Sequence, residues 1–287
     1  MIYHVIYNPL SANGNGEEKA RSLEKIYENT VYHNVTEIGD YREFFASLPE
    51  DDGIVLCGGD GTLNCFINNT DGIELNREIL YFAAGTGNDF LHDIGVDPGS
   101  EPISVNQYIK DLPRVTVKGK TYRFLNNVGF GIDGYCCEVG DKMKRTSDKP
   151  VNYTSIAIKG LLFHYNPTNA KITVDGKEYN YKKVWLAPTM KGRYYGGGMM
   201  AAPEQDRSNP DGTLSIMLFY GKGRLKTLMA FPSIFKGEHV KHDKMVAIHT
   251  GKEISVDFDK PAAVQIDGET ILGVTSYSAT ANVKVNA

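Results

Sequence analysis

A strongly apolar segment that runs straight into a glycine-rich loop constrains the fold of this chain more than any other feature. Residues 53–57 (GIVLC) are hydrophobic throughout, which is typical of a strand covered on both faces of a parallel sheet. Residues 58–62 (GGDGT) follow directly, and residues 63–69 have the pattern of a helix. In a doubly wound sheet, such a junction lies at the carboxyl ends of the strands, where ligands bind. The segment therefore predicts an α/β domain with a ligand loop after this strand.

The first third of the chain repeats this strand-and-helix rhythm. Strands are expected at residues 2–7, 31–36, 53–57 and 79–83, and helices at residues 17–28, 41–48 and 63–69. The alternation predicts a parallel sheet with helices on both sides, that is, a doubly wound α/β N-terminal domain.

Beyond residue 110 the pattern changes to short β-prone runs separated by turns. Strands are expected at residues 114–118, 122–128, 170–174, 182–187, 213–220, 253–258 and 263–266, with helices near residues 154–165 and 225–235. Asp175 and Gly176 have the composition of a hairpin turn. These features predict a mainly β, sandwich-like C-terminal domain. We place the domains at residues 1–118 and 119–287, and a return of the last strand to the first domain is left open.

The loop at residues 58–62 has the composition of a phosphate-binding loop. Its three glycines allow backbone amides to approach phosphate oxygens, and the following helix adds the positive end of its dipole. Thr62 and Asn64 could add a hydroxyl and an amide. Asp60 would repel phosphate unless a cation lies between them, which suggests Mg²⁺. The alternative is a tight turn in which Asp60 caps the helix.

A second small-residue motif, residues 85–90 (GTGNDF), follows the strand at residues 79–83. GGDGT resembles a loop shared by lipid kinases and nicotinamide-dinucleotide kinases, whereas GTGNDF resembles the second signature of the diacylglycerol kinase catalytic domain family. Residues 8–16 (NPLSANGNG) resemble the opening motif of that family, with Ala12 where glycine is usual. The family includes bacterial diacylglycerol kinases and relatives that act on sphingosine, ceramide or phosphatidylglycerol.

The resemblance implies an ATP-dependent lipid kinase, a transferase of lipid metabolism that binds ATP and Mg²⁺. Asp60 and Asp89 would position Mg²⁺ as catalytic residues. The residues that the resemblance and the loop chemistry assign to ATP are Asn8, Ser11, Thr36, Gly58, Gly59, Asp60, Gly61, Thr62, Asn64, Gly85, Thr86 and Asn88.

The acceptor chemistry is expected in the C-terminal half. A kinase needs a base near the attacking hydroxyl, and Glu269 follows a strand and an Asp-Gly turn in residues 265–269 (QIDGE). The family ends its second domain with a similar DGE, whose Glu accepts the proton of the lipid hydroxyl. The alternative is a hairpin turn with a solvated Glu269.

Two further sites follow from the resemblance. Asp211 and the carbonyl of Thr213 would hold a structural Mg²⁺, and Asp133 would complete the acidic network. A simple turn after Pro210 is the alternative at Asp211. Cys65 stands where the family often has Glu, so reduced activity or an inactive paralogue is left open.

Net charge and hydropathy limit the kinds of partner that the sequence predicts. The formal net charge of −4, from 31 Lys and Arg against 35 Asp and Glu, argues against a nucleic-acid binder. No apolar run reaches the ~18 residues of a membrane span, and the four cysteines are expected to be reduced. We expect a soluble, cytoplasmic protein that meets its lipid substrate at the inner face of the membrane. The basic segment at residues 222–244 would either dock on lipid headgroups or form a packed helix with a solvated face. Whether the protein forms a homodimer is left open. The rivals are a dinucleotide kinase and a catalytically silent, nucleotide-binding regulator.

Overall fold

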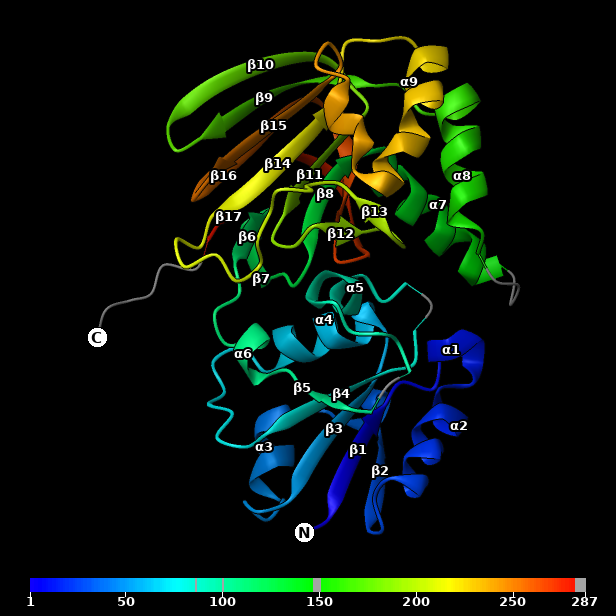
Figure 1. Ribbon diagram of the computed structural model, residues 1–287, viewed down its shortest axis with the longest axis vertical. Coiled ribbons are helices and arrows are strands. Elements are labelled where there is room, and N and C mark those ends of the chain that lie inside the picture. The colour runs from blue at the N-terminus through cyan, green and yellow to red at the C-terminus, as the bar shows by residue number, and fades with distance from the viewer. Residues whose placement is uncertain (86, 100, 147–150, 282–287) are drawn as a thin grey trace. The chain divides into compact units, whose positions relative to one another are not determined.

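The computed structural model describes residues 1–85, 87–99, 101–146 and 151–281, and it consists of two compact units, Met1–Leu112 and Pro113–Ala287 (Figure 1). The division lies six residues before the predicted boundary at residue 118. The reason is that β6 (Arg114–Val117) pairs with β7 (Lys120–Arg123) and β17 (Glu269–Thr280), which are strands of the second unit.

The first unit alternates strands and helices, as the sequence predicted. Its strands are β1 (Tyr3–Tyr7), β2 (Thr30–Asn34), β3 (Gly53–Gly58), β4 (Ile79–Ala83) and β5 (Ile103–Ser104). Its helices and helical turns are α1 (Ser11–Gly14), α2 (Gly16–Arg21), η1 (Ser22–Lys25), η2 (Val35–Glu37), α3 (Tyr41–Ala46), α4 (Asp60–Asn69), α5 (Asp89–Ile94) and α6 (Asn106–Ile109).

The sheet of the first unit has the order β2-β1-β3-β4-β5, in which β1 to β4 are parallel and β5 is antiparallel to β4. Leu23 of η1 packs with Val5 and Val55 on one face. On the other face, Phe44 of α3 makes an edge contact with His33 of β2. Helices therefore cover both faces, and the doubly wound α/β architecture is confirmed.

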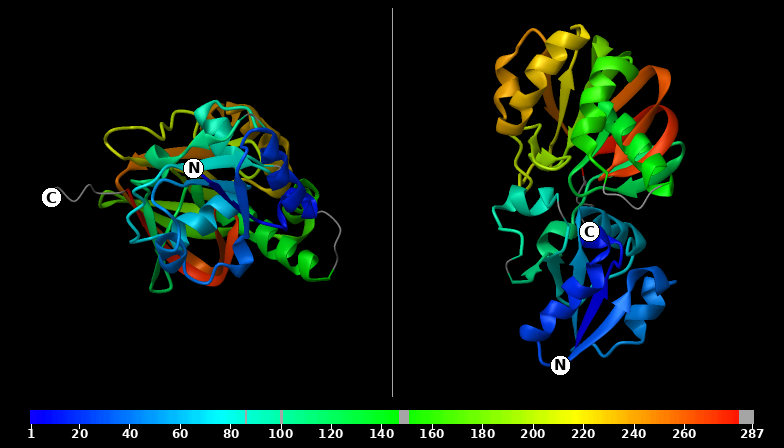
Figure 2. Two further views of the ribbon diagram at one scale, coloured as in Figure 1. Left: turned by 90° about the horizontal axis from the view of Figure 1, so that it is seen from below. Right: turned by 90° about the vertical axis from the view of Figure 1, so that its right-hand side faces the viewer.

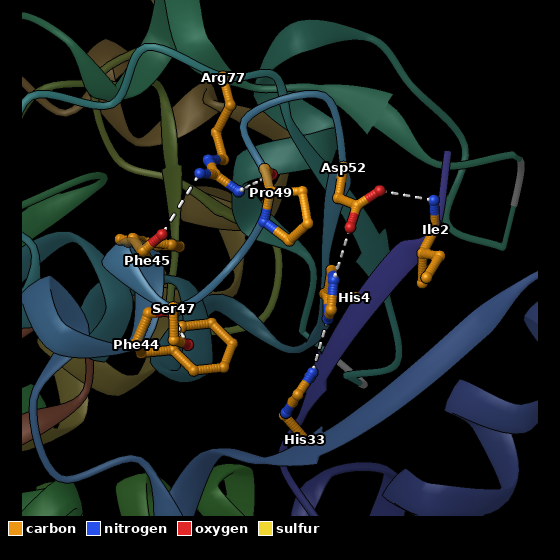
Figure 3. Close-up of polar contacts among 9 residues, drawn as sticks. All are labelled: Ile2, His4, His33, Phe44, Phe45, Ser47, Pro49, Asp52 and Arg77. Carbon is orange, nitrogen blue, oxygen red and sulfur yellow. Dashed lines mark hydrogen bonds and ion pairs between the residues drawn. The ribbon is translucent and has the colours of Figure 1, made fainter.

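A row of polar contacts runs from Asp52, just before β3, through His4 of β1 to His33 of β2 (Figure 3). The backbone N–H of Ile2 donates to Asp52 Oδ1 at 2.8 Å, and Asp52 Oδ2 lies 3.3 Å from His4 Nε2. His4 Nδ1 lies 2.9 Å from His33 Nε2. Burial lowers the pKa of His33, so its neutral form is favoured. These contacts help to fix the register of β1 against β2 and β3.

The second unit is mainly β. Its longer strands are β8 (Asn127–Gly131), β9 (Thr168–Val174), β10 (Lys177–Val184), β11 (Leu186–Met190), β14 (Leu214–Phe219), β15 (Val246–Gly251), β16 (Glu253–Ile266) and β17, with β6 and β7 and the short pair β12 (Tyr194–Tyr195) and β13 (Met199–Met200). Its helices and helical turns are α7 (Ile132–Thr146), α8 (Tyr153–Lys159), η3 (Gly160–His164), α9 (Arg224–Ala230), η4 (Phe231–Lys236) and η5 (Glu238–Lys241).

The long strand β16 joins the two parts of this sheet. Its first half pairs with β9 and its last three residues pair with β8, and the register shifts between Asp257 and Ala262. Phe258 of β16 stacks on Phe130 of β8 inside the core. The sequence predicted two separate strands here, because Pro261 interrupts the apolar pattern. The mainly β, sandwich-like class is confirmed, and β17, the last described strand, pairs within this unit rather than with the first sheet.

One long helix, α7, was not predicted. Glycines at positions 134 and 140 hide its pattern because glycine is a poor helix former. Both glycines allow close packing, since a Cβ atom on Gly134 would lie 2.0 Å from the Ala263 carbonyl oxygen and one on Gly140 2.7 Å from the Tyr153 ring. No helix among the described residues combines the length and apolar character that crossing a membrane requires.

Candidate active site

Two glycine loops meet at the carboxyl ends of adjacent strands in the first unit. Gly58 ends β3 and pairs with Ala83 at the end of β4. Beyond these residues the loops touch, because a Cβ atom on Gly85 would lie only 2.6 Å from the Cα atom of Gly59. A Cβ atom on Gly58 would collide with Thr62 at 2.4 Å. Glycine at position 85 is therefore required by the packing of one loop against the other, and glycine at position 58 by the packing of Thr62 within its own loop.

Asp60 connects the two loops. Its Oδ2 accepts a hydrogen bond of 2.8 Å from the backbone N–H of Asp89, and its Oδ1 one of 3.3 Å from that of Phe90. Asp60 thus caps α5, the helix that follows the second loop. A helix cap was the alternative that the sequence left open, but the helix is α5 and not the one that Asp60 itself begins.

The amino end of α4 has a different environment. Its N-cap residue is Gly59, which offers no side-chain cap in the described structure. The first-turn N–H groups of a helix have no acceptor within the helix, and they attract anions together with the helix dipole. Gly61 lies in this turn, and a Cβ atom there would meet nothing within 4 Å. The arrangement can therefore receive a phosphate group at α4.

The opening motif reaches the same place. Asn8 Nδ2 donates to Thr62 Oγ1 at 3.1 Å, which leaves the Thr62 hydroxyl proton available for a phosphate oxygen. The Asn8 carbonyl accepts from Ser11 Oγ at 2.7 Å, and a Cβ atom on Gly16 would lie 1.9 Å from that carbonyl oxygen. Ala12 has a φ of 51°, a left-handed conformation that glycine adopts with less strain. The structure therefore brings Asn8, Ser11 and Thr62 together.

The other residues predicted to bind the nucleotide differ in burial and in their hydrogen-bond partners. Thr36 is exposed beyond the carboxyl end of β2, where its hydroxyl donates to Asn34 Oδ1 at 2.8 Å. Asn64 is buried in α4, and its carbonyl oxygen accepts from the Asn68 amide. Asn88 has a φ of 48°, donates to the Gly85 carbonyl at 2.9 Å, and keeps a buried Oδ1 without a hydrogen-bond partner among the described residues. Thr86 lies outside the described residues.

In the second unit, Glu269 is exposed at the first position of β17, after a tight hairpin turn. Asp267 and Gly268 form the turn with φ values of 46° and 96°. The carboxylate of Asp267 accepts hydrogen bonds from the backbone N–H groups of residues 125, 126 and 127 at 2.5, 2.8 and 2.8 Å. Three bonds to one carboxylate fix the turn to the start of β8, so Glu269 extends from a rigid base.

Gln265 joins this hairpin to Asp133. Its Oε1 accepts from the Gly268 backbone N–H at 2.8 Å, and its Nε2 donates to Asp133 Oδ2 at 3.5 Å. Burial raises the pKa of Asp133 to about 6, although the Gly134 N–H and Gln265 oppose the shift. Asp133 and Glu269 also both act on Cys137, whose pKa is raised to about 12 mainly by burial. Gln265 is therefore the residue that connects the turn before Glu269 to Asp133.

The predicted structural metal site is a well-ordered turn. Asn209 Oδ1 accepts from the Asp211 N–H and Asn209 Nδ2 donates to Thr213 Oγ1, both at 2.9 Å. The Thr213 carbonyl accepts from Gln205 Nε2 at 2.8 Å and keeps a second lone pair. The exposed carboxylate of Asp211 fits an oxygen-ligated ion such as Mg²⁺, with further ligands from backbone and water.

No group of three or more acidic, histidine or cysteine side chains in the described residues could form a metal cage. An Mg²⁺ ion that arrives with a nucleotide typically takes one or two carboxylates and completes its shell with phosphates and water. Asp60 and Asp89 are the carboxylates that the sequence assigns to such an ion, and Asp60 also accepts two hydrogen bonds from the amino end of α5.

Sequence reasoning missed the residues that hold the hairpin and the metal turn in place. Asp267 and Gln265 carry the hairpin, and buried Arg207 donates to the Leu125 carbonyl at 2.6 Å and to Asn126 Oδ1 at 2.7 Å. Asp267 and Arg207 therefore anchor different loops to the same short segment. The Asp-Gly pair signalled a turn in the sequence, but only the fold shows what its carboxylate contacts.

Comparison with known proteins agrees with this geometry. Residues 3–118 match the model of the diacylglycerol kinase catalytic domain, and residues 126–284 match that of the YegS C-terminal NAD kinase beta sandwich-like domain. A diacylglycerol kinase of Mycobacterium tuberculosis is 27% identical over 252 residues, covering 83% of this chain and 79% of its own. A diacylglycerol kinase of Bacillus subtilis is 24% identical over 276 residues, covering 92% and 88%. The crystal structure of a diacylglycerol kinase from Bacillus anthracis has a TM-score of 0.61 and 20% identity over 98% of this chain and 94% of that chain, and shares the fold.

Proposed function

Since the chain belongs to the diacylglycerol kinase catalytic domain family, we propose that it transfers the γ-phosphate of ATP to the hydroxyl group of a diacylglycerol or a similar lipid. The observation that carries the proposal is the contact between the two glycine loops, which Asp60 connects through α5 and which leaves the amino end of α4 open to phosphate.

The first unit binds the nucleotide in this proposal. The N–H groups at the start of α4 and the Thr62 hydroxyl bind phosphate oxygens, and Asn8 orients that hydroxyl. The buried, unpartnered Oδ1 of Asn88 beside Gly85 is a further acceptor for a nucleotide hydroxyl. Asp60 and Asp89 would hold Mg²⁺ when it is bound with ATP, and the ion would supply positive charge against the charge that develops on the phosphates.

The second unit accepts the lipid. Glu269 takes the proton of the attacking hydroxyl, a role that typically contributes about 10²–10⁴-fold in rate. Gln265 and Asp267 do not touch the substrate, but they hold the hairpin from which Glu269 extends. A diacylglycerol is the leading acceptor because the relatives in Mycobacterium tuberculosis and Bacillus subtilis carry that name.

The test is a lipid panel incubated with γ-labelled ATP, the wild type and Glu269→Gln. We expect a labelled product in the organic phase with the wild type, and a loss of about 10²-fold or more with Glu269→Gln while ATP affinity is unchanged. Equal transfer by the variant would remove Glu269 from its role.

The same assay separates the rivals. With NAD as acceptor, labelled NADP and no labelled lipid would identify a dinucleotide kinase. Tight ATP binding with no turnover on any acceptor would identify a nucleotide-binding regulator.

A further inference from the structure

One peptide group of the second unit lies between two opposite charges. Arg207 Nη1 donates to the carbonyl oxygen of Leu125 at 2.6 Å. The N–H of Asn126 belongs to the same peptide group, and it donates to Asp267 Oδ1 at 2.8 Å. Both bonds are charge-assisted, and bonds at the two ends of one amide strengthen each other because each polarises the group further. This peptide therefore connects the Arg207 guanidinium to the turn that precedes Glu269.

The peptide needs these two side chains because it lies before the β-ladders. Residues 124–126 connect β7 to β8, and the pairing of β8 with β11 and β16 begins at residues 127 and 128. The green β8 lies next to the orange β16, which pairs with β17 (Figure 1 and the right-hand view of Figure 2). Leu125 and Asn126 are only 0% and 3% exposed, and buried backbone groups outside a ladder require other partners.

Asn126 contacts three loops through three different groups. Its N–H binds the hairpin turn through Asp267, and its side-chain Oδ1 accepts from Arg207 Nη2 at 2.7 Å. Its carbonyl oxygen accepts from the backbone N–H of Lys191, just after β11, at 2.8 Å. Arg207 thus binds the segment at a carbonyl and at a side chain, which suits the planar fork of a guanidinium.

The loop that carries Arg207 is itself held in place. Gln205, which is 5% exposed, donates from Nε2 to the Thr213 carbonyl at 2.8 Å. Its Oε1 accepts from the Ser215 hydroxyl of β14 at 2.5 Å. Arg207, which is 8% exposed, therefore extends from a loop fixed to the start of β14, so it can restrain residues 125–127 rather than follow their motion.

We propose that Arg207 is a positioning residue for phosphoryl transfer, which acts on Glu269 through the peptide between residues 125 and 126 and through Asp267. Without the guanidinium, this peptide loses the partner of its carbonyl, and the turn that it holds is expected to shift. A base must be placed closely, since a misplacement of about 1 Å can cost about 100-fold in rate. The inference rests on the proposed function in taking Glu269 as the base, and it assigns to Arg207 the placement of that base without contact to the substrate.

The first test is steady-state kinetics with a short-chain diacylglycerol dissolved as a monomer. Arg207→Met removes the charge and the donors, and it should lower kcat by about 10–30-fold with KM for ATP unchanged. Arg207→Lys keeps the charge and can still donate to the segment, so its kcat should recover to within about threefold of the wild type.

The matched control is Arg77→Met in the first unit. The Arg77 guanidinium also donates to two backbone carbonyls, those of Pro49 at 3.2 Å and Phe45 at 3.4 Å (Figure 3). Arg77→Met therefore loses the same kind of contact, and it should keep the kcat of the wild type. Thermal unfolding of each variant checks that it is folded at the temperature of the assay.

A double-mutant cycle shows whether Arg207 acts through Glu269. In the Glu269→Gln background, Arg207→Met should change kcat by less than about twofold, because the base that it positions is already lost. If Arg207→Met does not fold, Asn126→Ala removes one of the two acceptors of Arg207 and should show the same pattern with a loss of about fivefold. Equal losses of kcat in the two backgrounds would overturn the proposal, and so would a wild-type kcat in Arg207→Met.

Hydrogen exchange gives a readout that does not depend on the acceptor. In Arg207→Met the backbone N–H groups of residues 125–127, which donate to Asp267, should exchange about tenfold faster, whereas those of β14 should be unchanged. Unchanged exchange at residues 125–127 would overturn the proposal. Faster exchange there, together with a loss of kcat for phosphate transfer to NAD and no transfer to lipid, would support the positioning by Arg207 and refute the proposed function.

Discussion

The Asp60 carboxylate accepts a hydrogen bond of 2.8 Å from the backbone N–H of Asp89, which joins the first glycine loop to the helix that follows the second. The bond makes the two loops one unit, since neither can move far without breaking it. It also uses Asp60 to cap α5, so that the amino end of α4 keeps its N–H groups for a ligand. Helix capping and anion binding are thus divided between two neighbouring helices.

Replacing Asp60 should affect both stability and nucleotide binding. Asp60→Ala removes the cap of α5 and should lower the free energy of unfolding by about 1–2 kcal/mol. It should also abolish detectable ATP binding by calorimetry, because the two loops lose their connection and Mg²⁺ loses a ligand.

The matched control is Asp40→Ala. Asp40 caps α3 through the N–H groups of Arg42 at 2.6 Å and Glu43 at 3.2 Å. The Asp40→Ala variant should lower the free energy of unfolding by a similar amount, about 1 kcal/mol, and should bind ATP like the wild type. If both variants bind ATP equally well, Asp60 is a helix cap and nothing more.

Ala12, in the opening motif at residues 8–16, has a backbone conformation that strains alanine more than glycine. Its φ of 51° is in the left-handed region, where a Cβ atom is strained. Ala12→Gly should therefore raise the free energy of unfolding by about 0.5–1 kcal/mol in urea denaturation. A lower midpoint in the glycine variant would show that the loop gains nothing from relief of this strain.

Gln265 should act by positioning the hairpin rather than by touching the substrate. Gln265→Met keeps the length of the side chain but removes the bonds to Gly268 and Asp133. A small displacement of Glu269 is expected to lower kcat by about 10–100-fold, with KM for ATP unchanged. Steady-state kinetics should show the lower kcat together with the unchanged KM for ATP. A variant that loses only thermal stability would contradict the positioning role.

Asp133 should make stability depend on pH. Burial raises its pKa from 3.8 to about 6, so the folded chain holds this proton more tightly than the unfolded chain. Its contribution is fully present below about pH 4 and is lost as the pH rises through about 6. Asp133→Asn should therefore gain stability relative to the wild type between pH 4 and pH 7, by about 2–3 kcal/mol in urea denaturation. A difference that stays constant over this range would contradict the raised pKa.

Local sequence signals predicted the first unit well because its elements are short and regular. The strand at residues 79–83 was predicted with the ends that β4 has, and the strand at residues 53–57 differs from β3 by one residue. The helix expected at residues 17–28 is instead α2 followed by η1, a tighter 3₁₀ segment that ends at Lys25. The second unit was predicted less completely. The glycines of α7 allow close packing but weaken its helical pattern, and the register of β16 shifts between Asp257 and Ala262.

The candidate site was predictable in its motifs but not in its connections. Glycines that precede Asp60 and Asn88 at the ends of two strands indicated ligand-binding loops, since glycine lets the backbone approach a ligand closely. The cap that Asp60 makes on α5 and the three bonds of Asp267 join residues far apart in the sequence, about 30 and about 140 positions, and no local pattern encodes them. Gly134 is likewise explained only by the fold, because the carbonyl of Ala263 leaves no room for a Cβ atom there.

The most direct test of the central claim is a crystal structure of the chain with Mg²⁺ and a non-hydrolysable ATP analogue. The account predicts the triphosphate at the amino end of α4, within hydrogen-bonding distance of Thr62 and beside Gly85. A nucleotide bound elsewhere, with both glycine loops free of phosphate, would contradict it.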